Sequence, residues 1–350
     1  MERSVVTDLL CSLISTPSLS CEEDKTADLI ESFLKERGNV TFRKGNNVWV
    51  QSLIDERLPV ILLNSHHDTV KPSASWTRDP FTPSIENGRL YGLGSNDAGA
   101  SLVSLMMTYL HFEKQKERKF NLIYAATAEE EIAGQNGIAL ILDDLGHIDL
   151  AIVGEPTQMQ MAVAEKGLIV LDCETIGKTG HAARNEGVNA IYLAMEDIEW
   201  FRNFKFPHTS HQLGDVKMSV SVINAGYQHN IVPDSCKYVV DVRTNEHYNN
   251  FDVVSIINSN MKHSTVKPRS MNTKSSSIPM EHPVVQRGLS LGLTAFGSPT
   301  TSDQTKIDYT SIKIGPGDSS RSHSADEYIL LEEIQNGIDI YIKLLNGLEL

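Results

Sequence analysis

The sequence contains few cysteines and no long hydrophobic run. Its four cysteines are spread over 350 residues without a C-x-x-C pair. They therefore indicate neither a sulfur-ligated zinc site nor a redox motif, and they are too few for a disulfide scaffold. The N-terminal segment carries acidic residues early and lacks the apolar stretch of a secretory signal. No run approaches the length of a membrane span. We expect a cytoplasmic protein with reduced thiols and no membrane partner.

Basic residues are also in short supply. Lysine and arginine number 31 against 45 acidic residues, which gives a formal net charge of -14. This excess of acid argues against nucleic acid or an anionic membrane surface as a partner. Its simplest role is to keep the protein soluble. A composition of 40% hydrophobic and 22% charged residues is typical of folded proteins, and 350 residues suffice for two domains and a large core.

The pattern of hydrophobic residues changes twice along the chain. Residues 1–165 alternate strand-like and helix-like segments, including helices expected at 98–112 and 135–145, which predicts an α/β fold with a mainly parallel sheet. The α/β pattern returns after 268, with a helix expected at 284–296, a strand at 311–314 and a closing helix at 331–345. We therefore predict one domain built from 1–165 and 269–350, interrupted by a smaller one.

The inserted segment, 166–268, has a different order of elements. Period-two alternation predicts half-exposed strands, and longer amphipathic stretches predict helices. The expected strands are 168–175, 216–224, 236–244 and 264–267, and the expected helices are 187–203 and 249–261. The order β-α-β-β-α-β is that of a ferredoxin-like unit with a four-stranded sheet.

Three apolar runs end in residue types that bind metal ions. Residues 59–65 run into His66-His67-Asp68, 120–128 into Glu129-Glu130-Glu131, and 149–154 into Glu155. Short apolar runs of this kind are typical of buried parallel strands. Open parallel sheets place their functional groups beyond the carboxyl ends of the strands. A histidine and several carboxylates have little reason to gather at one such edge except to hold a cation.

The first two candidate sites have structural alternatives. In extended backbone His66 and Asp68 lie on one face, so that the imidazole can bind a metal ion while the carboxylate holds its other nitrogen. The alternative is a histidine pair at a solvated strand end. Asp97 stands where a G-x-G-x-x-G dinucleotide fingerprint needs its third glycine, so that motif fails. Asp97 is then either a ligand or a helix N-cap.

The acidic triplet repels itself and costs free energy if it is buried without a partner. It forms either a solvated turn or a site with a compensating cation, in which one residue is a ligand and its neighbour a general base. Glu155 and His323, the latter in the glycine-rich loop 315–323, extend the set. Two imidazoles and several carboxylates suit zinc, cobalt or manganese, and they suffice for two ions that share a bridging carboxylate.

In their order along the chain and in their residues, these motifs resemble those of the co-catalytic zinc amidohydrolases and peptidases, the family of acetylornithine deacetylase and succinyl-diaminopimelate desuccinylase. The acetylornithine deacetylases are the members that the chain resembles most. The resemblance covers nearly the whole chain. The matching segments are 65–70, 76–81, 88–97, 127–131 and 153–156.

The resemblance implies a role for each candidate residue. Asp97 would bridge two divalent ions, most readily zinc, with cobalt or manganese as alternatives. His66 and Glu155 would complete one site, and Glu131 and His323 the other. Asp68 would orient His66, and Glu130 would be the general base.

The resemblance also implies that 166–268 is a dimerisation domain of a homodimer, whereas 1–165 and 269–350 form the catalytic metal-binding domain. His181 would reach the partner's active site and help to bind the developing oxyanion. Asn230 and Arg243 would hold the substrate carboxylate. The alternatives are a surface loop histidine, a turn residue and a strand-edge charge.

The implied activity is hydrolysis of the amide of a small N-acyl amino acid, with N2-acetyl- or N2-succinyl-ornithine in arginine biosynthesis as the leading substrate. The alternatives are succinyl-diaminopimelate, a di- or tripeptide, and a non-catalytic binding protein on the same scaffold. Two positions depart from the family pattern. Ala98-Gly99 follows Asp97 where lysine-glycine is usual, and Glu129 replaces an aspartate, which leaves Glu129 as an alternative base.

Overall fold

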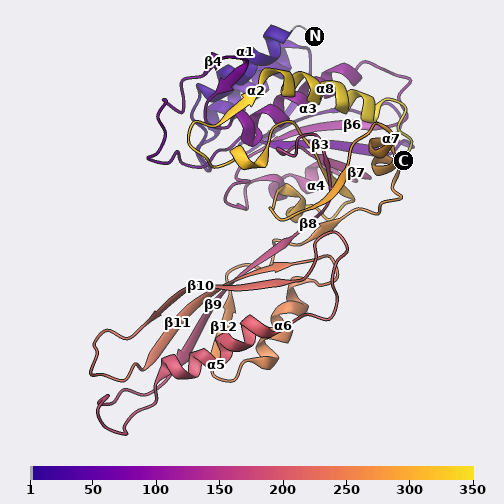
Figure 1. The fold of residues 1–350 in the computed structure, drawn as a ribbon. Coiled ribbons are helices and arrows are strands. Elements are labelled where there is room, and N and C mark those ends of the chain that lie inside the picture. Colours follow the sequence, from indigo (N-terminus) through magenta and orange to yellow (C-terminus); the bar gives the residue numbers. More distant parts are fainter. Residues whose placement is uncertain (1–2) are drawn as a thin grey trace. The chain divides into compact units, whose positions relative to one another are not determined.

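A computed structural model describes residues 3–350, which form two compact units (Figure 1). The first unit comprises the chain up to Val163 together with Ser277–Phe296 and Ser302–Leu350. The inserted unit comprises Ala164–Ser276 and Gly297–Thr301. The helices are α1 Arg3–Ile14, α2 Asp24–Glu36, α3 Ala100–Phe112, α4 Leu142–Leu145, α5 Ala190–Asn203, α6 Asn250–Asn260, α7 Pro283–Ser290 and α8 Leu331–Leu345.

The strands are short in the first unit and longer in the inserted one. They are β1 Thr41–Lys44, β2 Asn47–Ser52, β3 Val60–His66, β4 Ser84–Glu86, β5 Arg89–Tyr91, β6 Asn121–Thr127, β7 Leu150–Val153, β8 Met161–Glu165, β9 Gly167–Ile176, β10 Lys217–Ala225, β11 Ser235–Thr244, β12 Ser264–Pro268, β13 Ser276–Ser277, β14 Ala295–Ser298, β15 Ser311–Lys313 and β16 Tyr328–Leu330.

The main sheet of the first unit has the order β1-β2-β6-β3-β7-β15-β8-β13. Its centre, β6-β3-β7-β15, is parallel throughout, which confirms the predicted mainly parallel α/β fold. The register pairs His66 with Thr127 across β3 and β6, and Asn64 with Val153 across β3 and β7. The residues that follow these strands therefore emerge at one edge of the sheet.

Two hydrophobic clusters cover the two faces of this sheet. Alternate residues of β3 divide between them, with Ile61 and Leu63 in the larger cluster and Leu62 in the smaller. Every residue of α3 except His111 is buried, because α3 belongs to the larger cluster and also packs against α8. The packing of these two hydrophobic clusters thus fixes the positions of the strand ends, which carry the polar residues.

Two predicted helices are shorter than expected. Within 135–145 only α4 is α-helical, after a 3-10 turn at Ile138–Leu140, because the preceding chain is folded around the Glu129 side chain. Within 284–296 the helix α7 ends at Ser290, and Gly292 adopts φ +85° as the chain turns into β14. The apolar residues after this turn continue the helical spacing of α7, so the sequence predicts a longer helix than the one that forms.

The inserted unit has the sheet order β10-β11-β9-β12, with antiparallel pairs throughout. With α5 and α6, the chain order is β9-α5-β10-β11-α6-β12, which is the β-α-β-β-α-β order that the sequence predicts. The sequence boundary at 268 differs from the observed one. The unit extends to Ser276 because Leu168 N donates to Thr273 O and Asn250 Nδ2 donates to Met271 O.

Across residues 3–350, none of the helices has both the length and the apolar character that a membrane crossing requires.

Candidate metal centre

Strand β3 ends in His66, whose side chain is buried. His66 Nδ1 lies 3.0 Å from the Asp68 carbonyl oxygen and 3.4 Å from Asp68 Oδ1. If Nδ1 carries the proton, as these acceptors favour, the Nε2 lone pair points away from Asp68. Among residues 3–350 this nitrogen has no hydrogen-bond partner. It faces three carboxylates, at 3.4 Å from Asp97 Oδ1, 3.7 Å from Glu155 Oε1 and 3.9 Å from Glu130 Oε2.

His67 points away from these carboxylates. Its Nδ1 lies 2.9 Å from Thr26 Oγ1, and its Nε2 lies 2.9 Å from Asn46 O. Burial lowers the pKa of His67 to about 4, so the ring is neutral at pH 7. His67 is therefore a hydrogen-bonded core residue.

Asp68 connects His66 to the acidic triplet. Its Oδ1 accepts a hydrogen bond from Glu130 N at 3.0 Å, and its Oδ2 accepts one from Glu131 N at 3.2 Å and another from Ser20 Oγ at 2.7 Å. Burial alone would raise the pKa of Asp68, but the contact with His66 and these donors hold the pKa below its usual value. One ionised carboxylate thus fixes both the imidazole and the backbone of the triplet.

Glu129 leaves the centre. Its backbone has φ 54°, and its side chain turns to Asn136, whose N and Nδ2 donate to its two oxygens at 3.0 and 2.8 Å. A Cβ at Gly134 would lie 2.0 Å from Glu129 Oε2, so a glycine is needed where the chain passes this side chain. Only Glu130 and Glu131 of the triplet face the imidazoles, which favours Glu130 over Glu129 as the base.

The remaining side chains form two overlapping groups. His66, Asp97 and Glu131 make one, and His66, Glu130 and Glu155 the other, with the ligand atoms of each group within 4.8 Å of one another. His323 Nε2 joins the first group at 2.9 Å from Glu131 Oε2 and 3.7 Å from Asp97 Oδ2. The two oxygens of Asp97 therefore face different imidazoles, which is the arrangement that a bridging carboxylate requires.

The electrostatics of this cluster favour a bound cation. Burial raises the pKa of Glu130 and of Glu155 well above the usual range, and it raises the pKa of Glu131 as well. Carboxylates this close together, with only a small part of each side chain exposed, cannot all ionise cheaply without positive charge between them. The unpartnered His66 Nε2 and the purely nitrogen and oxygen donor set fit two ions of the zinc, cobalt or manganese type.

Two buried acids next to the centre carry no clear signal in the sequence. Asp303 Oδ2 accepts a hydrogen bond from Thr127 Oγ1 at 2.7 Å, and burial raises the pKa of Asp303 to about 6. Glu327 accepts backbone hydrogen bonds from the segment that carries Asp97, and burial raises the pKa of Glu327 to about 8. Neither follows a long apolar run. The only local signal for Glu327 is its place just before the short strand β16.

The three candidate residues of the inserted unit do not form one cluster. His181 and Asn230 come together, because Ala182 N donates to Asn230 O at 3.0 Å. Arg243 lies on β11, where its Nε and Nη2 donate to Asp241 at 2.8 and 3.1 Å. The roles of all three in substrate binding remain predictions.

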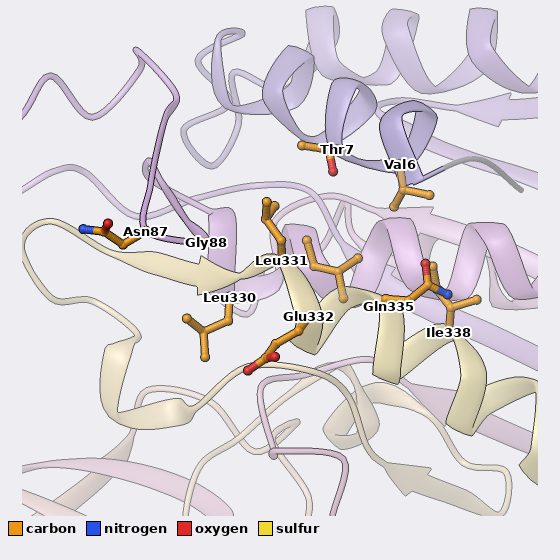
Figure 2. A pocket seen from close by; sticks show the side chains of 10 residues that line it. Val6, Thr7, Asn87, Gly88, Leu330, Leu331, Glu332, Gln335 and Ile338 are labelled. Carbon is orange, nitrogen blue, oxygen red and sulfur yellow. The ribbon is translucent and has the colours of Figure 1, made fainter.

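The first unit also contains a cavity of about 380 Å³ between α1, the turn between β4 and β5, and the start of α8 (Figure 2). Val6, Leu331 and Ile338 contribute apolar side chains to it, and Glu332 an acidic one. Its lining shares no residue with the metal cluster, so this cavity is separate from the candidate metal centre.

Comparison with known proteins agrees with this geometry. A sequence model described as peptidase family M20/M25/M40 matches residues 62–347. A succinyl-diaminopimelate desuccinylase from Xylella fastidiosa is 26% identical over 269 residues, which are 70% of this chain and 69% of that one. An acetylornithine deacetylase from Myxococcus xanthus is 25% identical over 325 residues, 87% of this chain and 83% of that one. The crystal structure of an aminopeptidase from Bacillus cereus shares the fold, with a TM-score of 0.81 and 18% identity over 99% of this chain and 98% of that one.

Proposed function

Because the chain belongs to the peptidase family M20/M25/M40, we propose that it hydrolyses the amide bond of a small N-acyl amino acid with the help of two divalent cations. The observation that carries this proposal is the position of Asp97. Its Oδ1 lies 3.4 Å from His66 Nε2 and its Oδ2 lies 3.7 Å from His323 Nε2. A carboxylate that lies between two imidazoles, with further carboxylates nearby, can bind two cations at once.

The ligands divide around Asp97. His66 and Glu155 would hold one ion, and Glu131 and His323 the other. Zinc suits this nitrogen and oxygen set, and cobalt and manganese are the alternatives. When bound, the two ions would lower the pKa of a water between them and polarise the acyl carbonyl.

Glu130 is the proposed general base. Burial, the first cause of its raised pKa, brings a carboxylate closer to the range in which it can both take and return a proton near neutral pH. Glu130 would accept a proton from the attacking water as the carbon–oxygen bond forms. As the carbon–nitrogen bond breaks, it would return that proton to the leaving amine. Asp68 holds Glu130 in place through its backbone N–H.

The substrate is proposed from the relatives. A desuccinylase and a deacetylase both remove an acyl group from an amino acid nitrogen, and N2-acetyl- or N2-succinyl-ornithine, in arginine biosynthesis, is our leading candidate. Arg243 would bind the α-carboxylate by paired charge-assisted hydrogen bonds, and to do so it must exchange or share Asp241. Asn230 would assist it. A succinyl group would need a second cationic anchor, for which Lys71, Arg89, Lys178 and Arg184 remain open.

A homodimer is the proposed assembly. Strand β10 is an edge strand of the inserted sheet, and its Val222 and Ile223 are exposed. Tyr192 and Met195 on α5 are exposed as well. An apolar edge strand offers unpaired backbone groups to a second strand, so pairing between two copies of β10 would cover it. In such a dimer His181 is proposed to help to bind the oxyanion in the partner's active site.

A di- or tripeptidase is the second candidate, because a structure of the same fold is an aminopeptidase. The discriminating experiment measures kcat/KM on acetyl-ornithine, succinyl-ornithine, succinyl-diaminopimelate and glycine-containing dipeptides, with metal content determined on the same sample. We expect one of the acyl-ornithines to be the best substrate at two ions per chain. A preference for the peptides would replace the proposed substrate class. Binding without any product release would instead indicate a non-catalytic protein.

A further inference from the structure

Glu327 is 2% exposed, and its carboxylate accepts three backbone hydrogen bonds from one short segment. Its Oε1 accepts from Asn96 N at 2.7 Å and from Asp97 N at 2.9 Å, and its Oε2 accepts from Gly94 N at 3.1 Å. The Glu327 carbonyl oxygen accepts a fourth bond, from Gly92 N at 3.0 Å. Glu327 therefore accepts hydrogen bonds from four of the six backbone N–H groups between Gly92 and Asp97.

This segment needs such support. Gly94 has φ +75°, and Asp97 has φ -117° and ψ 97°, so the turn that leads into α3 is not regular helix. Ser95 N donates to Gly92 O, whereas the N–H groups of Gly94, Asn96 and Asp97 donate to the Glu327 carboxylate instead of to the carbonyl oxygens of a preceding turn. Buried N–H groups without an acceptor are costly. Glu327 supplies these acceptors, and in doing so it fixes the direction in which the Asp97 side chain leaves the backbone.

A second set of contacts ties the Asp97 segment to the loop that carries His323. Asn96 Nδ2 donates to Asp318 O at 3.1 Å, and Asp318 N donates to Asn96 Oδ1 at 2.9 Å. A Cβ at Gly317 would lie 2.4 Å from Asn96 Oδ1, so this close approach requires the glycine. The two segments that carry Asp97 and His323 are thus fastened together by the same turn that Glu327 holds.

We propose that Glu327 is a positioning residue for the ion pair, which holds the Asp97 backbone so that the two oxygens of Asp97 can serve two cations at once. The proposal rests on the proposed function, because it assigns Glu327 to the same centre. The geometry carries the proposal, because Asn96 N and Asp97 N both donate to Glu327 Oε1, so a change at Glu327 would shift the backbone from which the Asp97 side chain leaves.

The inserted unit provides a matched control. Asp197 is also buried, and it also accepts three backbone hydrogen bonds, from Lys262 N at 2.9 Å, His263 N at 3.1 Å and Ser264 N at 2.8 Å. All of the proposed ligands belong to the first unit, whereas Asp197 belongs to the inserted unit. Glu327→Gln and Asp197→Asn therefore remove the same kind of interaction, the first in the unit that carries the ligands and the second in the other unit.

The experiment titrates the metal-free wild type and both variants with Co²⁺ or Zn²⁺, and follows ion stoichiometry, affinity and the cobalt absorption spectrum. For Glu327→Gln we expect affinity for the second ion to fall about 10–100-fold, as is usual when an outer partner of a ligand is removed, and the cobalt spectrum to change. We expect Asp197→Asn to lower the melting temperature while both ions bind with wild-type affinity and spectrum.

The outcomes are distinguishable. Wild-type affinity and spectrum in Glu327→Gln would overturn the role of Glu327 even if its melting temperature fell, and would leave the proposed function standing. A wild-type protein that binds no ion pair would overturn the proposed function and this inference together. If Glu327→Gln does not fold, Glu327→Asp keeps the carboxyl group and draws it back by one methylene. A smaller loss of affinity is then expected, and no loss would overturn the inference.

Discussion

Asp197 in the inserted unit and Glu130 and Glu155 in the first unit all have little exposure, but their pKa values shift in opposite directions. In the inserted unit, burial would raise the pKa of Asp197, but three backbone donors lower it below its usual value. In the first unit, burial raises the pKa of Glu130 and Glu155 well above the usual range, and the nearby imidazole of His66 only partly opposes this. Asp197 serves the fold. Glu130 and Glu155 cost the fold free energy unless a cation is bound.

This difference separates structural from functional acids without reference to any relative. Asp197, whose three backbone donors come from one short segment, supports the turn that leads into β12. Carboxylates that converge on an unpartnered imidazole nitrogen indicate a site. Glu327 lies between the two cases, because it has its own donors and also lies beside Asp97.

Removal of the metal ions should have the largest effect, and it should change the first unit while leaving the inserted unit unchanged. After dialysis against a chelator, hydrolysis of the best substrate should fall at least about 10³-fold, because the ions are expected to supply several kcal/mol of transition-state stabilisation. Hydrogen exchange should accelerate at the ends of β3 and β6 and stay unchanged in β9 and β11. Added Zn²⁺, Co²⁺ or Mn²⁺ should reverse both effects. Full activity in metal-free protein would contradict a metal-dependent reaction.

Glu130→Gln should have the next largest effect. We expect turnover to fall by roughly two to four orders of magnitude, with both ions retained, because proton transfer is lost while the ligands remain. Glu129→Gln is the control, since Glu129 bonds to Asn136 and lies outside both ligand groups. It should affect the melting temperature more than the turnover. A near-normal rate in Glu130→Gln would remove Glu130 as the base.

Mixing two inactive variants tests whether the inserted unit takes part in the chemistry. Glu130→Gln chains and His181→Ala chains should each be impaired. A heterodimer would contain one site with both Glu130 and a partner His181 intact, so activity should return on mixing. Absence of recovery in heterodimers verified by mass would count against a role of His181 in trans.

The smallest expected effect concerns stability against pH. His67 has a folded pKa of about 4 against an ordinary value of 6.5, so its contribution is fully present above pH 6.5 and is lost as the pH falls towards 4. The loss amounts to at most about 3 kcal/mol. His67→Gln should flatten the free energy of unfolding between pH 6.5 and pH 4.5 relative to wild type, measured by denaturant titration. Parallel curves for the two proteins would show that His67 is not neutral and buried as described.

Much of the candidate centre follows from local sequence because its residues end strands of one parallel sheet. A recognisable apolar run leads into each of these residues: His66 ends β3, Glu130 lies three residues after β6, and Glu155 lies two residues after β7. The inserted sheet is similarly visible, since β9 and β11 alternate between buried and more exposed residues.

The rest depends on contacts between distant segments. Glu327 bonds to a turn far earlier in the chain, and no periodicity connects the two. Asp303 reaches Thr127 from a short turn without a preceding strand. The expected helix at 135–145 was wrong for most of its length because Glu129 takes Asn136 as its partner, which a helical pattern cannot reveal.

The most direct test of a shared ion pair is anomalous scattering from crystals of the metal-loaded protein, recorded at the absorption edge of the bound metal. We predict two peaks about 3.5–4 Å apart, with Asp97 between them. His66 and Glu155 should border one peak, and Glu131 and His323 the other. A single peak away from Asp97, or none while these five side chains keep their positions, would contradict a shared ion pair.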